Sequence, residues 1–197
     1  MTLHHWDYEP DALDVRISEL LVATADGSDA LIDQAVPEVL RLLRQHLKMD
    51  VVFVSEFVDG RRVFRRVDTA PEARVIEAGQ SAPLEETYCQ RVVDGRLPRL
   101  VHDVAGTPGH FDLPPTDFPI GAHLSTPIVL NDGRVYGTLC CFSFSPNHAL
   151  TQRDLRKLEM SAELTAKKIN DSRTRAAEKT MAQWELQPKD EDKRSPR

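Results

Sequence analysis

Two short turn signals restrict the fold of this 197-residue chain more than any other feature. Asp59-Gly60 separates two β-prone segments, 50–57 and 61–68, and Asn131-Asp132-Gly133 separates 120–130 from 134–145. Such residues fit tight hairpin turns because they tolerate the positive φ that these turns require. A hairpin joins neighbouring strands that run in opposite directions, so the sequence predicts an antiparallel sheet.

Helical patterns surround these strands. Residues 11–25 and 29–47 carry apolar side chains at helical spacing, and a long helix is expected from Thr151, with Asp154 at its capping-box position. Residues 81–95 indicate a short helix capped by Ser81, and residues 97–104 indicate a short strand. Residues 105–119, rich in proline and glycine, indicate an irregular loop of the kind that often carries function. This order of elements predicts an α+β fold.

Composition excludes several classes of protein. Lys and Arg number 25 and Asp and Glu number 31, so the net charge of −6 argues against a nucleic-acid-binding protein. No apolar run approaches the ~20 residues of a membrane span, and the first residues lack the layout of a secretory signal. Three cysteines are too few for a disulfide framework. We therefore expect a cytoplasmic protein without nucleic-acid or membrane partners.

The segments "LEETYCQRVVDGRLPRLVHDV", "IGAHLSTPIVLNDGRVYGTLCCFS" and "LTQRDLRKLEMSAEL", in this order around a Pro/Gly loop, resemble a GAF domain. The resemblance covers residues 29–170, leaving an N-terminal helix and linker at 1–28 and a C-terminal helix extension with a disordered tail at 171–197. It implies an antiparallel sheet with helices on one face and a small-molecule pocket under a loop on the other. It also implies a regulatory role towards an output module, such as a kinase, a cyclic-di-GMP enzyme or a transcription activator.

The cysteines decide whether thiol chemistry is expected. Cys140 and Cys141 are adjacent in a strand, so their side chains point to opposite faces and cannot both bind one metal without bending the strand. The alternation of polar and apolar residues places Cys140 on the pocket face and Cys141 in the core. Cys89 lies in the short helix beside the expected pocket. Free methionine sulfoxide reductases with this fold use cysteines in a different arrangement.

The expected pocket draws on residues around the loop and the two strands beside it. The histidines and aspartates near the loop, including His110, Asp112 and Asp117, show no metal-ligand spacing, so turns and loop tips explain them and no metal site is expected. His123 lies in the middle of a strand, with Ser125 on the same face, where a side chain can orient a ligand. The candidate pocket residues are Cys89, His102, Asp103, His123, Ser125, Tyr136, Thr138 and Cys140. No catalytic residue and no cofactor is assigned.

The preferred hypothesis is a sensor of bacterial-type signal transduction that binds a small molecule and transmits the signal through its terminal helices. The long helix carries a seam of residues at a spacing that suits a helical partner, so a homodimer is expected. The members of that seam are Leu155, Leu158, Ala162, Thr165, Ile169 and Ser172. Two alternatives remain: a thiol-dependent reductase that uses Cys89 or Cys140, and a dimerisation module whose pocket is closed.

Overall fold

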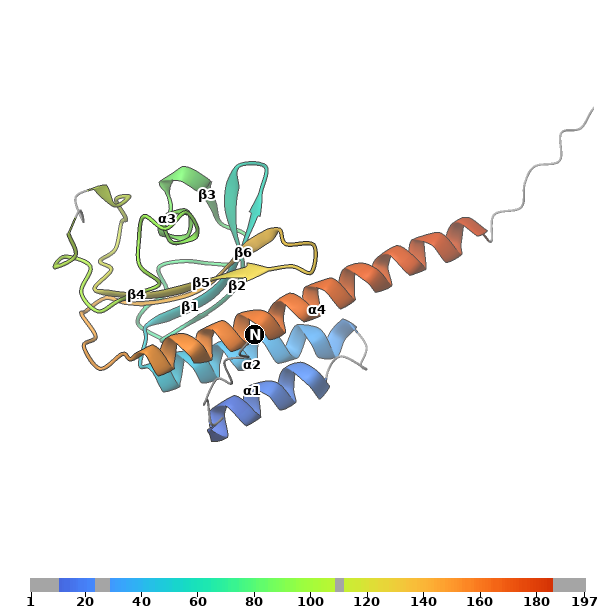
Figure 1. Ribbon diagram of the computed structural model, residues 1–197, viewed down its shortest axis with the longest axis horizontal. Helices are drawn as coiled ribbons and strands as arrows, with labels where there is room; N and C mark the ends of the chain where they lie inside the picture. The colour runs from blue at the N-terminus through green and yellow to red at the C-terminus, as the bar shows by residue number, and fades with distance from the viewer. Residues whose placement is uncertain (1–10, 24–28, 109–111, 186–197) are drawn as a thin grey trace, which may run out of the picture.

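A six-stranded sheet forms the centre of the computed structural model, which describes residues 11–23, 29–108 and 112–185 (Figure 1). All its strand pairs are antiparallel, as the turn signals predict. The strand order is β3-β2-β1-β6-β5-β4. The bounds are β1 Val51–Val58, β2 Arg61–Thr69, β3 Ser81–Pro83, β4 Leu100–Val101, β5 Ala122–Val129 and β6 Val135–Ser143.

The β1–β2 turn explains why this hairpin forms. Asp59 and Gly60 adopt φ values of 50° and 68°, which are the positive angles expected at both central positions of a type I′ turn. The twist of this turn matches that of the strands beside it, so β1 pairs with β2 from the turn onward. The local sequence at the turn therefore favours the observed pairing of the two strands.

Three long helices lie on one side of the sheet: two of them cover its face, and the first packs against those two helices (Figure 1). They are α1 Ala12–Ala23, α2 Asp29–Leu47 and α4 Gln152–Glu185. Leu43 of α2 and Leu158 of α4 are fully buried and pack with Leu139 and Cys141 of β6. The main core therefore lies between the helices and this face, and Cys141 belongs to it.

The seam of α4 faces the sheet instead of a separate helical partner. Leu158 and Ala162 belong to the main core, and Leu155 and Ile169 pack against it. Their periodicity is that of any helix with one buried face, so it does not identify the partner. The seam therefore does not itself identify a partner helix, and the homodimer stays a prediction. Arg173 still forms an ion pair with Glu56 of β1 at 3.8 Å, and the last part of the helix projects away from the domain (Figure 1).

The segment 81–95 differs from the expected single helix. Ser81 and Pro83 belong to β3 and pair with Val63 and Arg61 of β2. A 3₁₀ turn, Leu84–Glu86, follows, and the helix α3 spans only Tyr88–Val93. Its N-cap is Thr87, whose hydroxyl accepts a hydrogen bond from the Gln90 amide at 3.2 Å. The pairing with β2 prevents Ser81 from acting as the predicted cap.

Candidate functional site

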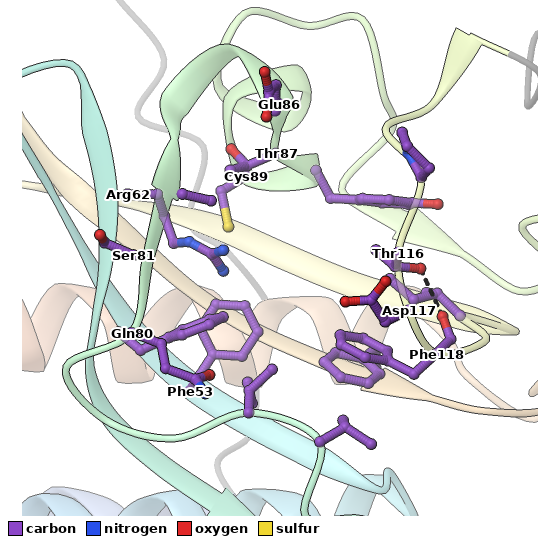
Figure 2. A pocket seen from close by; sticks show the side chains of 18 of the residues that line it. Phe53, Arg62, Gln80, Ser81, Glu86, Thr87, Cys89, Thr116, Asp117 and Phe118 are labelled. Atoms are coloured by element: carbon purple, nitrogen blue, oxygen red, sulfur yellow. Dashed lines mark hydrogen bonds between the residues drawn. The ribbon is translucent and has the colours of Figure 1, made fainter.

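A cavity of about 890 Å³ lies on the face of the sheet opposite the three long helices. Phe53 of β1, Phe64 of β2 and Phe142 of β6 form an aromatic floor, and α3 borders the cavity with Cys89 (Figure 2). Residues 115–118, which we call the flap, complete the wall. The expected pocket between the sheet and the loop at 105–119 is therefore present, and His123 lines it together with the flap.

A stacked aromatic pair holds the flap against the sheet. The ring of Phe118 lies nearly parallel to that of Phe142, with 5.3 Å between the centroids. The Thr116 hydroxyl donates a hydrogen bond to the Phe118 carbonyl oxygen at 2.6 Å, which closes a tight local turn (Figure 2). Stacking of this kind contributes about 0.5–1.5 kcal/mol beyond the area it buries. The stacked pair therefore joins the flap to β6 at the wall of the cavity.

Arg62 brings a positive charge into the cavity from β2 (Figure 2). Its guanidinium carbon lies 3.7 Å from the centroid of the Phe64 ring, a cation–π contact. Within the described part of the chain, Arg62 forms no ion pair, and its Nε is buried without a hydrogen-bond partner. Burial lowers the pKa of this guanidinium, but arginine stays charged in proteins. The cavity therefore offers an unpaired cation to an anionic group.

His123 of β5 is the second polar side chain at the cavity with an unsatisfied hydrogen-bonding atom. The residue is only 2% exposed, yet its Nδ1 has no hydrogen-bond partner among the described residues. Its ring lies beside that of Tyr88, with 5.5 Å between the centroids. Burial lowers the pKa of His123 to about 4, so the imidazole is neutral near pH 7. A neutral imidazole in a pocket wall can accept or donate a hydrogen bond to a ligand.

Behind Cys89, a row of buried polar side chains runs under the cavity floor. The sulfur atoms of Cys89 and Cys140 are 3.7 Å apart, and Cys140 Sγ lies 2.8 Å from Ser125 Oγ and 3.1 Å from Thr138 Oγ1. The Thr138 hydroxyl in turn lies 2.8 Å from that of Ser55. This network satisfies polar groups that would otherwise be buried without partners.

The predicted pocket residues fall into three groups. Cys89 and His123 line the cavity, while Ser125, Thr138 and Cys140 lie on the same face but beneath it, in the buried network. His102, Asp103 and Tyr136 lie elsewhere. Whether Cys89 and His123 contact a ligand stays a prediction.

His102 and Asp103 serve the local structure at the end of β4. The His102 Nε2–H donates to the Leu150 carbonyl oxygen at 2.8 Å, which ties this edge of the sheet to the start of α4. The Asp103 carboxylate accepts a hydrogen bond from the Gly106 amide at 3.3 Å within a turn. Their placement in the pocket was wrong, because both side chains are used by the chain around them.

Tyr136 lies on the helix-covered face. It packs against the main core and borders a groove with Thr165 and Ile169 of α4. The β5–β6 register shifts here, since Gly137 pairs with Ile128 but Val135 pairs with Val129, which leaves Tyr136 as an extra residue. Such a bulge breaks the strict alternation of faces. The expected pocket side of Tyr136, which rested on that alternation, was therefore wrong.

A metal site is not formed by any group of three or more histidine, cysteine, aspartate or glutamate side chains within the residues described. His110, which the sequence placed near the loop, lies outside that part of the chain. Nor does any described helix combine the length and apolar character that crossing a bilayer requires.

A family model of the GAF domain matches residues 29–170, which is most of the chain. The chain belongs to the GAF domain family. A comparison with curated proteins found no match.

Solved GAF domain structures share the fold. The GAF domain of an Acinetobacter phosphoenolpyruvate-protein phosphotransferase superposes with a TM-score of 0.64 at 15% identity, covering 84% of this chain and 97% of that one. The phycoerythrobilin-bound GAF domain of a cyanobacterial phytochrome gives 0.62 at 15%, covering 86% and 100%. The free methionine-R-sulfoxide reductase of Neisseria meningitidis, solved with its substrate, gives 0.59 at 18%, covering 87% and 99%. At these identities the likeness establishes the fold alone.

The sequence reasoning missed two kinds of pocket residue in this GAF domain. Arg62 is one of four arginines in "RRVFRR", and nothing local distinguishes it from its neighbours. Phe53 and Phe64 of the floor looked like ordinary strand core, whereas Phe142 shares the strand face on which Cys140 was expected to meet the pocket. Strand alternation places Arg62 and Phe64 on the same face of β2, so it was the one signal that could have grouped them.

Proposed function

We propose that this GAF domain is a sensory module that binds a small molecule in the cavity between the sheet and the flap. The observation that carries the proposal is His123, which lines the cavity and whose buried Nδ1 has no hydrogen-bond partner in the described residues. Buried polar atoms in native proteins are almost always hydrogen-bonded, so a bound molecule is the natural partner. A cavity of about 890 Å³ also favours this role over a module with a closed pocket.

The walls indicate the chemistry of the ligand. Arg62 supplies an unpaired positive charge at one side, and Phe53, Phe64 and Phe142 supply an apolar floor. Glu86 and Asp117 also line the cavity, so a ligand's anionic group should lie at the Arg62 side. A small aromatic or heteroaromatic anion, with one polar atom directed at His123, satisfies all of these groups.

Two measurements test ligand binding. Mass spectrometry of the native protein identifies any compound that co-purifies, and thermal unfolding is compared with benzoate, nucleoside monophosphates and neutral benzamide. We expect the anions to raise the unfolding temperature and benzamide to leave it unchanged. Arg62→Gln should abolish the shift, whereas Arg61→Gln, at the exposed neighbouring position, should preserve it. The proposal fails if no compound co-purifies and no aromatic anion stabilises the protein.

The signal would leave the domain through its helices, and we propose a homodimer as its carrier. The flap and α4 contact opposite faces of the same sheet. A ligand that orders the flap can therefore shift the equilibrium between different positions of α4 on the sheet. Past residue 171, α4 is largely exposed up to Trp184, and that stretch is the surface available to a second copy or an output module. We propose a kinase, a cyclic-di-GMP enzyme or a transcription activator as the class of output.

The role proposed is binding and regulation without turnover, in the cytoplasm. The three cysteines are free thiols, which supports a reducing compartment.

A further inference from the structure

Two thiols from different elements meet where the cavity reaches the sheet. Cys89 comes from α3 and Cys140 from β6, and their sulfur atoms are 3.7 Å apart. The sulfur atoms of a disulfide are about 2.05 Å apart, so a small rotation of the side chains brings the two sulfur atoms from contact to bonding distance. The Cys89 sulfur points into the cavity (Figure 2), whereas Cys140 lies fully buried behind it. A small oxidant in the cavity therefore reaches one thiol of the pair first.

The surroundings make the two thiols unequal. The hydrogen bond from Cys140 and the nearby Arg62 charge lower the pKa of Cys89 to about 7, against the opposing effect of burial. Burial raises the pKa of Cys140 well above its ordinary value. Besides these two thiols and Arg62, the titratable or charged groups around the cavity are Tyr88, Glu86, Asp117 and His123. Cys89 is thus suited to be the attacking thiolate and Cys140 the second thiol.

We propose that Cys89 and Cys140 form a peroxide-reactive pair that closes to an intramolecular disulfide. The sensor then responds to hydroperoxides at its pocket in addition to binding a ligand there. This inference does not depend on the identity of that ligand. Closing the bond ties α3, which borders the cavity, to the central strand β6.

The chemistry proceeds in two balanced steps. The Cys89 thiolate attacks one oxygen of the hydroperoxide, the O–O bond breaks, and the other oxygen leaves as an alcohol or water after taking up a proton. Cys89 is then a sulfenic acid. The Cys140 sulfur attacks the Cys89 sulfur, the S–O bond breaks, and the hydroxide leaves as water with the proton of the Cys140 thiol. Two thiols are oxidised and one hydroperoxide is reduced.

The experiment treats the reduced full chain with hydrogen peroxide at pH 7, blocks remaining thiols with iodoacetamide, and maps the peptides by mass spectrometry. We expect a cross-link between the peptides that hold Cys89 and Cys140. Cys141 offers a matched control, since it is adjacent to Cys140 but lies on the helix-covered face. Burial raises its pKa and keeps it protonated, so we expect its oxidation to be at least about tenfold slower than that of Cys89.

Three variants separate the roles. Cys141→Ser should form the cross-link at the rate of the wild type, and Cys89→Ser should form none. Cys140→Ser should halt at the Cys89 sulfenic acid, which dimedone captures. A wild-type protein that shows no Cys89–Cys140 link after peroxide overturns the proposal, and this result stands even if a variant fails to fold. A link that joins Cys89 to Cys141 overturns it as well.

Discussion

His123 shows how one buried side chain makes stability depend on pH. Its pKa is about 4 in the folded protein because burial disfavours the charged form, against about 6.5 in an unfolded chain. The unfolded state therefore binds more protons between these two pH values, and folding stability falls as the pH drops from 6.5 towards 4. From pH 7 to pH 5 this histidine alone should remove about 2 kcal/mol from the free energy of unfolding.

Urea denaturation of the wild type and of His123→Gln at both pH values measures this contribution. Glutamine keeps a polar group but does not titrate, so the variant should lose about 2 kcal/mol less than the wild type on acidification. Equal losses in the two proteins would show that His123 is already accessible to water.

Single residues also show which parts of the site could be predicted from the sequence and which could not. His123 and Cys140 were placed correctly on the pocket face because each lies in the regular part of its strand, where faces alternate. Arg62 was not predicted because it matters through the absence of an ion-pair partner among the described residues, and no sequence pattern reveals such an absence. His102 was misplaced because its hydrogen bond to Leu150 joins residues 48 positions apart.

Among the elements, β6 departs from a regular strand at its bulge. Next to the Tyr136 bulge, Gly137 lies against β1 so closely that a Cβ there would be 2.0 Å from the Ser55 carbonyl oxygen. Because that oxygen belongs to the backbone, Gly137→Ala should force the strands apart and destabilise the protein by about 1–3 kcal/mol or more. The midpoint of urea unfolding measures the loss.

Gly106→Ala is the control for this prediction. Its Cβ would lie 3.1 Å from the carboxylate of Asp103, a side chain that can move aside, so its cost should be clearly smaller. If the two variants unfold at the same midpoint, the close approach of β6 to β1 is not what requires glycine at position 137.

The helix α1 is fixed to α4 by a buried charge cluster. Lys157 of α4 is almost fully buried and forms ion pairs with Asp11 and with Asp14, the latter at 3.4 Å. Replacing the lysine leaves the buried Asp14 carboxylate without its cation, which typically costs about 3–5 kcal/mol. Lys157→Met should therefore loosen α1, and hydrogen exchange of the α1 backbone amides should rise.

The double variant Lys157→Met, Asp14→Leu tests the cause. Removing Lys157 and Asp14 replaces the more buried pair of the cluster by apolar groups, and such replacements are often neutral or stabilising. The remaining Asp11 is partly exposed and lies 4.0 Å from Arg153. Slow exchange in α1 should therefore return. Exchange that remains fast in the double variant would point to lost packing instead of an uncompensated charge.

For the whole molecule, the layers could be predicted because local signals agreed with one another. The two hairpin turns fixed antiparallel neighbours, and the helical periods marked faces that must be buried. The partner of a buried face could not be predicted in this way. The seam of α4 contains Leu158 and Ala162, and its spacing is the same whether it meets a sheet or another helix.

A dimer must therefore use a surface that the sheet leaves open, and the far part of α4 provides one (Figure 1). Met181 is 66% exposed and Trp184 is 78% exposed, and they lie three residues apart, on neighbouring turns of one helical face. Exposed apolar groups grouped in this way indicate a contact surface. We expect the full chain to sediment as a dimer, and the double variant Met181→Glu, Trp184→Glu to sediment as a monomer.

The thermal stability of each domain should change little in this variant, because neither side chain belongs to the core. Val129→Glu is the matched control, since Val129 is also a large apolar residue, 48% exposed, but lies on β5 away from this part of α4. It should sediment like the wild type. A monomeric wild type, or a dimer that survives both glutamates, would show that α4 passes its signal to a different chain or through a different surface.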